Sequence, residues 1–354
     1  MIDVSRYTDT TELVFDVEFI TPTFLGGADG NAEIRTAPFK NLIRRWWRIV
    51  NGNLNPNELW QKESELFGST ERNPETVEQN KSRKKSEKEP EVFGKSKIDL
   101  KIKQILPSDE YKSSAHIDIG RIESKFGSMD LSKYLGYGSV GIKEYIKPKT
   151  KCTFVLTLES KYKNEIIDSL FLIILFGTCG SKSKNGFGSI NVIPKQNSFE
   201  FNPPRVFGKF GNWKGILNSS KKYPSKICSD ENGVLAWKTK NFNSWNLAFE
   251  EIGLVYHDAL SFIKAKIPNG RKVFGMAKGN SRLPSQVIVK VCPQKVKVEN
   301  SIMTKYYGLI IHIPYEIENW ELEEQKQVGY LLHDYFDKDS RVTGWQRQIT
   351  GAAK

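Results

Sequence analysis

Residues 24–50 read FLGGADGNAEIRTAPFKNLIRRWWRIV, and this stretch decides how we expect the chain to fold. It opens with a glycine-rich turn and continues into a predicted helix that begins at Ala37 or Pro38 and ends at Val50, where turn residues follow. Apolar residues recur in the helix at spacings of three and four: Phe39, Leu42, Ile43, Trp46, Ile49 and Val50. This spacing places one apolar stripe on the helix and predicts that the stripe packs into a core.

Several cations of the same helix lie off this stripe. The off-stripe residues are Lys40, Arg44, Arg45, Arg48 and Trp47. No acidic residue occurs between Ile34 and Glu58, and like charges at i,i+4 repel each other by a few tenths of a kcal/mol. A solvated outer face explains such a helix without any function. A bound polyanion is the alternative, because it would neutralise the charge, and Trp47 would then border the cationic face.

The composition favours an acidic partner. The 354 residues include 53 Lys+Arg and 41 Asp+Glu, which leaves a formal net charge of +12 and a sequence pI near 9.3. Such an excess predicts binding to nucleic acid. A membrane surface is a rival, but the longest strongly apolar run, 170–176, is far too short to span a bilayer. The first residues, MIDVSRYTDTTE, contain no apolar signal core, so we expect a cytoplasmic protein.

The cysteines and histidines are not spaced as metal, disulfide or catalytic sites. Cys152, Cys179, Cys228 and Cys292 stand far apart and form no CxxC pair. The four histidines are equally dispersed, and the two that precede an aspartate do not face it, because neighbouring positions on a helix point apart. We therefore expect no metal ion and no cofactor.

The first half of the chain predicts an alternation of strands and helices. Residues 12–20 alternate polar and apolar side chains, as a half-buried strand does. The glycine turn and the helix of 37–50 come next, and the further elements are a short helix at 57–66, strands at 97–106, 152–159 and 189–193, and a helix at 164–176. The last turns of that helix are apolar all round, which predicts burial on two sides.

One segment of this half breaks the pattern. Residues 71–90 contain a single aliphatic side chain, too little apolar surface to offset the entropy of ordering them. We expect a mobile surface insertion there.

A second glycine-rich basic loop, 178–190, reads TCGSKSKNGFGSI. It is not a phosphate-binding P-loop, because that motif needs the order GxxxxGK[ST] and a helix after the glycines, whereas here a helix precedes and a strand follows. Its glycines would let the backbone approach a sugar-phosphate chain, and Lys182 and Lys184 would supply charge. A flexible connection with ordinary lysines is the alternative.

The predicted order of elements favours an α+β class. Strand, helix, two strands, helix, strand is the ferredoxin-like or RRM-like plan, and we expect residues 1–195 to form one such domain. Residues 196–354 then contain a linker with Pro203-Pro204 and similar elements in a different order: a helix at 244–267, a third glycine and cation loop at 270–284 with Lys278 and Arg282, strands at 286–291 and 306–313, and a helix at 320–336. We interpret the chain as tandem ferredoxin-like domains, the second one divergent.

These motifs together resemble the RAMP superfamily (repeat-associated mysterious proteins). The matching stretches are residues 21–48 followed by ELFGS, then YLGYG at 134–138, the second glycine loop, and SRLPSQVIVKV at 281–291. Within the superfamily the sequence looks most like the family of the first subunit of the Cmr complex, the type III-B CRISPR effector. It departs from the pattern of that family in having Lys40-Asn41 before the arginines and lysines in the late loop. Lysine keeps the charge but lacks the arginine fork for bidentate phosphate contact.

The resemblance implies a non-catalytic RNA-binding subunit of an antiviral ribonucleoprotein. Such a subunit would sit with other RAMP subunits at the 3′ end of the guide RNA and help capture target RNA. The residues expected to contact RNA are Arg35, Lys40, Arg44, Arg45, Arg48, Lys182, Lys184, Lys278 and Arg282, with Trp47 stacking on a base. A groove between the glycine loops is the expected path of the strand.

Two other functions stay open at this point. Some RAMP proteins are endoribonucleases; no histidine precedes His116, so the candidate acid is Asp29 in the glycine turn, with His116 and Asp118 behind it. An aspartate in such a turn is more often engaged in local turn chemistry. The third function is protein assembly, in which the basic face pairs with an acidic partner subunit.

Overall fold

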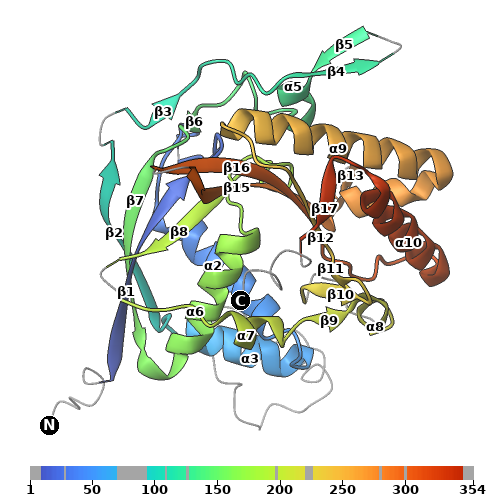
Figure 1. Ribbon diagram of the computed structural model, residues 1–354. Helices are drawn as coiled ribbons and strands as arrows, with labels where there is room; N and C mark the ends of the chain where they lie inside the picture. The colour runs from blue at the N-terminus through green and yellow to red at the C-terminus, as the bar shows by residue number, and fades with distance from the viewer. Residues whose placement is uncertain are drawn as a thin grey trace, which may run out of the picture.

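The protein is a mixed α+β molecule, as expected, and contains two sheet-and-helix units (Figure 1). The computed structural model describes residues 9–27, 29–69, 94–107, 110–124, 127–195, 198–219, 226–278, 281–298 and 301–345. The insertion expected at 71–90 lies outside these described residues. Within them, no helix is long and apolar enough to cross a membrane.

The first unit is built on a four-stranded sheet of order β2-β7-β1-β8. Its elements in chain order are β1 (Thr10–Phe19), α2 (Thr36–Val50), α3 (Pro56–Phe67), β2 (Ile98–Leu106), β7 (Lys151–Glu159), α6 (Lys163–Phe176) and β8 (Ile190–Pro194). All three strand pairs are antiparallel, and Phe15 of β1 stands opposite Phe154 of β7. The unit therefore runs strand, helix, strand, strand, helix, strand, with α3 as an addition.

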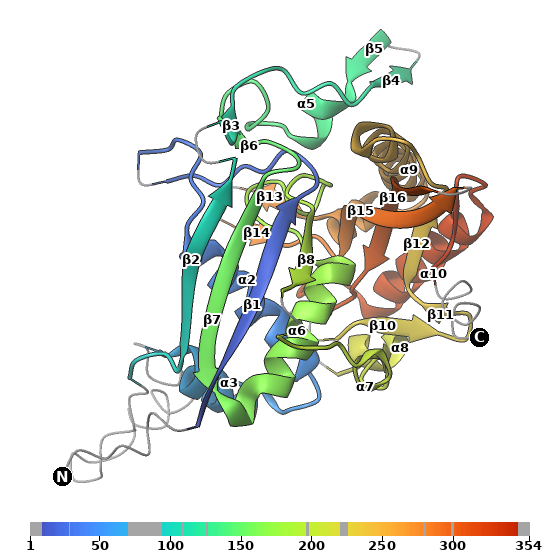
Figure 2. The same ribbon diagram turned by 60° about the vertical axis from the view of Figure 1, so that its left-hand side comes forward.

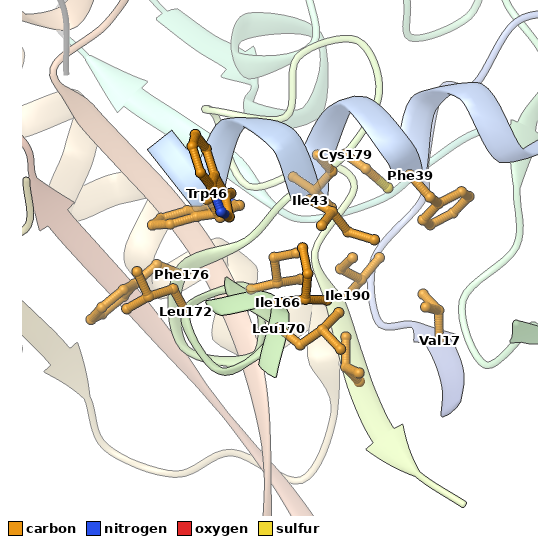
Figure 3. Close-up of a cluster of buried hydrophobic side chains, with 14 of the residues drawn as sticks. Val17, Phe39, Ile43, Trp46, Ile166, Leu170, Leu172, Phe176, Cys179 and Ile190 are labelled. Carbon is orange, nitrogen blue, oxygen red and sulfur yellow. The ribbon is translucent and has the colours of Figure 1, made fainter. Parts of the chain in front are cut away.

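Helices α2 and α6 pack against each other and on one face of this sheet (Figure 3). The predicted apolar stripe of α2 is buried, and the helix ends at Val50 with Asn51 as its C-cap. Trp46 lies on Phe176 of α6 with 6.1 Å between ring centroids. The stripe and the end of this helix are thus confirmed.

The second unit repeats this topology. Its sheet has the order β15-β16-β12-β17. Its elements are β12 (Ala236–Thr239), α9 (Trp245–Lys266), β15 (Val287–Val298), β16 (Ser301–His312), α10 (Leu322–Lys338) and β17 (Val342–Gly344). The expectation of a different order of elements was therefore wrong. Strands β12 and β17 were not predicted because they have four and three residues and show no alternation in the sequence.

Smaller elements connect and decorate the two units. Between β2 and β7 lie β3 (Lys112–Ser113), β4 (Arg121–Ser124), β5 (Gly127–Asp130), α5 (Leu131–Leu135) and β6 (Tyr145–Ile146). Between the units lie α7 (Pro203–Phe207), β9 (Gly211–Asn212), α8 (Trp213–Leu217), β10 (Cys228–Asp230) and β11 (Gly233–Val234). The hairpin of β13 (Met276–Lys278) and β14 (Ser281–Leu283) precedes β15.

Strand β15 joins the second unit to the first. Its Lys290 is fully buried, and the ammonium group donates hydrogen bonds to the carbonyls of Ile173, at 2.8 Å, and Ile174, at the end of α6. The backbone N–H of Val289 donates to the carbonyl of Lys184 in the second glycine loop at 2.8 Å. Helix α6 is therefore buried on two sides, as its apolar last turns predicted.

Candidate nucleic-acid interface

The first glycine turn, the second glycine loop (178–190) and helix α2 line a groove of about 480 Å³. Its walls are Phe24, Leu25, Gly26, Arg35, Pro38, Asn41, Leu42, Arg45, Thr178, Cys179, Gly180, Ser181 and Ser183. The sequence predicted the loops separately and expected a groove between them. The fold brings them together because β1 and β8, which flank the loops, are neighbours in the sheet.

Direct backbone contacts hold the loops side by side. The N–H of Ser181 donates to the carbonyl of Phe24 at 2.9 Å, and that of Gly188 donates to the carbonyl of Pro22 at 3.0 Å. Gly180 has a φ of +85°, and a Cβ atom there would come within 2.6 Å of the Phe24 carbonyl oxygen. Only glycine allows this approach, so the narrow separation of the loops depends on it.

The N-terminus of α2 opens at this groove. Arg35 occupies the N-cap position, its side chain makes no capping hydrogen bond, and the first turn contains no acidic residue. The guanidinium of Arg35 instead donates to the Gly26 carbonyl at 2.8 Å, which leaves the side chain exposed at the rim. Free amides and the helix dipole at such an end favour a negatively charged ligand.

Arg45 contributes an uncompensated positive charge to the wall of the groove. It is partly buried, burial lowers the pKa of its guanidinium, and it forms no ion pair or side-chain hydrogen bond within the described residues. Its charged neighbour is another cation, Lys184, whose ammonium donates to the carbonyl of Ser285. Burial and, secondarily, the charge of Arg45 lower the pKa of Lys184 to about 7. Two adjacent cations without an anion are unfavourable in the free protein, and a phosphate group in the groove would relieve this.

The other cations of α2 face a different neighbour. Arg44 forms a short ion pair with Glu63 of α3, and Arg48 approaches the same carboxylate at 3.4 Å. The ammonium of Lys40 donates to the carbonyl of Ile98 at 3.1 Å. These contacts hold α2 against α3 and β2. Arg44 and Arg48 thus share one carboxylate, which compensates one of their two positive charges, and the interpretation that a polyanion neutralises the rest stays a prediction.

Residues 16–191 match the sequence model of the RAMP superfamily. The chain is a member of the RAMP superfamily. The CRISPR system Cmr subunit Cmr1-2 of Pyrococcus furiosus is 29% identical to it over 192 residues, which are 51% of this chain and 95% of that relative.

The comparison with solved structures found two matches along most of the chain. The crystal structure of Cmr1 from Pyrococcus furiosus in its apo form superposes with a TM-score of 0.44 at 13% identity, covering 91% of this chain and 96% of that one. A cryo-EM structure of the type III-B Cmr-β complex bound to cognate target RNA contains a chain with a TM-score of 0.42 at 13% identity, covering 91% and 100%.

In this RAMP protein the expected role of Trp47 is wrong. Its indole is only 1% exposed, and its Nε1 donates to the Glu165 carboxylate of α6 at 2.7 Å. A base therefore has no access to the ring. The helical spacing suggested one buried face, but α2 is packed between α3 and α6, so both tryptophans are inside.

The remaining predicted residues differ in position. Lys182 stands beside the groove, between Ser181 and Ser183, with a left-handed φ of +58°. Lys278 and Arg282 are in the β13–β14 hairpin, and their side chains lie outside the described residues. The hydroxyls of Thr178, Ser181 and Ser183 were not predicted. Their spacing in TCGSKS and the glycines around them are the signal that could have indicated them.

The contacts of Asp29 are those of a turn. Its carboxylate accepts hydrogen bonds from the backbone and side-chain amides of Asn31 at 3.0 and 2.6 Å, and these bonds lower its pKa. His116 lies 3.6 Å from Asp130, and Asp118 accepts a bond from the Gly120 amide at 3.1 Å. Each of the three residues is thus engaged locally.

Proposed function

We propose that this RAMP protein is a non-catalytic RNA-binding subunit of a cytoplasmic type III-B CRISPR ribonucleoprotein. In this proposal it sits with other RAMP subunits at the 3′ end of the guide RNA and helps capture target RNA for antiviral defence. The superfamily match and the similarity to a Cmr1 subunit support the assignment. We further propose that the chain consists of tandem ferredoxin-like domains, 1–195 and 196–354, because both units have the same order of elements and the same order of strands.

The observation that carries the proposal is the arginine of the groove. Arg45 is a partly buried cation with no counter-ion among the described residues, next to hydroxyl groups and a free helix N-terminus. Arginine, hydroxyls and backbone amides are the groups with which proteins hold phosphates. Contacts of this kind position a strand without reading its sequence, so guide and target pairing would supply the specificity.

Binding of a fluorescent ~40-nucleotide single-stranded RNA to the full chain, followed by anisotropy, tests this role. Arg45→Gln removes a charged hydrogen-bond donor worth about 1.5 to 3 kcal/mol, so we expect affinity to fall about 10- to 150-fold. Arg48→Gln is the matched control, because it removes the same charge from the same helix on the side of Glu63. Wild-type protein that fails to bind RNA at low salt, or two variants that lose affinity equally, would contradict the proposed site.

The position in the complex and the absence of catalysis need separate measurements. In a reconstituted effector, a photoreactive nucleotide at the guide 3′ end should crosslink to this chain, and a crosslink only from the 5′ end would refute the position. RNA should stay intact during incubation with the chain and Mg²⁺. Cleavage that Asp29→Ala abolishes would establish a nuclease instead.

A further inference from the structure

A second groove, of about 510 Å³, lies on the opposite face of the first sheet. Its walls are Glu18, Ile20, Lys149, Lys151, Asn191, Ile193, Pro293, Lys295, Thr304 and Tyr306. Along β1 the buried Val17 and Phe19 belong to the core beneath the helices, so Glu18 points to the other face. The β15–β16 hairpin forms the far wall and lies beside β8 in both ribbon views (Figures 1 and 2).

Lysines from both units converge on this groove. Lys149 and Lys151 come from the first unit and Lys295 from the second; all three are exposed. None of the three forms an ion pair within the described residues. Their one polar side-chain contact in that part of the chain is a hydrogen bond of 3.1 Å, which the ammonium of Lys295 donates to the Thr304 hydroxyl. Among the described residues of the wall, Glu18 is the single acid. The groove therefore has an excess of positive charge that suits an anion.

An aromatic ring and uncharged polar groups complete the set. Tyr306 is partly buried, and burial, followed by the nearby Glu18, raises the pKa of its phenol. Asn191 and Thr304 supply an amide and a hydroxyl. Proteins that bind single-stranded nucleic acid combine these elements: cations for the phosphates and an aromatic ring on which a base stacks. A cavity of this size accommodates a ligand of nucleotide dimensions.

The backbone presents Lys149 in an unusual way. Its φ is +69°, a left-handed conformation in which glycine or asparagine is usual and lysine is unfavourable. Its N–H donates to the carbonyl of Phe19 at 2.7 Å, which fixes this turn at the end of β1. Glycine would suit this backbone better, so a lysine here costs conformational free energy.

We propose that this second groove binds a further segment of single-stranded RNA, with phosphates at Lys149, Lys151 and Lys295 and a base on Tyr306. The inference rests on the RNA-binding function proposed above. The RNA segment in this groove would be continuous with the RNA in the first groove. Both grooves lie at the same end of the first sheet: Ile20 borders the second and Phe24 the first.

The test compares charge-matched variants of the full chain. The logarithm of affinity falls as the logarithm of salt concentration rises, and for a ~40-nucleotide single-stranded RNA each lost phosphate contact makes this slope shallower by about 0.7. Lys151→Gln/Lys295→Gln should therefore make the slope shallower by about 1.4. Lys101→Gln/Lys103→Gln, which removes two exposed lysines of β2 away from the groove, should leave it unchanged.

Two single variants separate binding from folding. Lys149→Gly should melt no lower than wild type, because it relieves the left-handed lysine, yet should bind RNA more weakly. Tyr306→Leu should lower affinity about 5- to 150-fold, corresponding to loss of one stacked base, while Tyr306→Phe should retain it. A photoreactive uridine in the bound RNA should crosslink to Tyr306.

The outcomes distinguish the two proposals. If the lysine pair variant has the affinity and salt slope of its control while Arg45→Gln loses binding, the second groove is wrong and the first stands. If the wild-type chain binds no RNA, the proposed function itself fails.

Discussion

Replacing the buried Lys290 by methionine should change stability in a pH-dependent way. The ammonium lies in the interface between the units, and burial lowers its pKa to about 8 from the ordinary 10.5. Methionine has a similar volume and no charge, so packing is largely preserved. At neutral pH the variant loses two charged hydrogen bonds, worth about 1.5 to 3 kcal/mol each. It also escapes the penalty of burying an ammonium, about 3 kcal/mol for a pKa lowered by this amount.

These opposing effects leave a modest net destabilisation at pH 7, between zero and about 3 kcal/mol. At higher pH the unfolded chain holds a proton on Lys290 that the folded chain has released. Stability of the wild type therefore rises through the window from pH 8 to 10.5. The variant lacks this gain, so the difference between the two proteins should widen by about 2 to 3 kcal/mol from pH 7 to pH 10.

Urea unfolding of both proteins at pH 7, 8, 9 and 10 measures this difference, because other titrating groups are common to both and cancel. The m-value should be equal in the two proteins, which checks that the same surface unfolds. A stability difference that is constant across this range, or that narrows, would refute the reasoning that Lys290 is charged and buried at neutral pH.

Three further predictions concern the core. Gly186→Ala should destabilise the protein by more than about 2 kcal/mol in urea melts, because φ is +95° and the added Cβ would lie 2.3 Å from the Phe249 ring; an unchanged midpoint would contradict the packing. His312 and His333 share a hydrogen bond of 2.8 Å, and burial lowers the pKa of His312 to about 3 and that of His333 well below its usual value. The free energy of unfolding should therefore fall as the pH drops from about 6.5 towards 3, by up to ~1.4 kcal/mol for each pH unit and each histidine. In urea melts of His312→Leu/His333→Phe it should fall less steeply. Trp47→Phe should lower stability by about 1 to 2 kcal/mol and leave RNA affinity unchanged. A loss of RNA affinity without loss of stability would mean that Trp47 contacts RNA.

The strong periodic signals of the sequence were reliable. The stripe of α2, its end before Asn51 and the long helix α9 follow from spacing and turn chemistry, which are local properties. Strands β12 and β17 were missed because they are too short for a period of two to be visible. Because these two strands were not predicted, the repetition of the first unit by the second was not recognised from the sequence.

The features of the candidate site likewise separate into those that local sequence predicts and those that long-range packing sets. The sequence by itself determined the two glycine loops, the cations and the apolar stripe between them, since these depend on residue type and spacing. Only the tertiary structure decided which cations have an acidic partner: Glu63, distant in sequence, pairs with Arg44 and Arg48, whereas Arg45 turns to the groove and meets no acid in the described part of the chain. Periodicity reports that one face of a helix is buried, but the number of neighbours that pack on the helix is set by the fold. The same long-range packing encloses Trp47 and joins two separate loops into one groove.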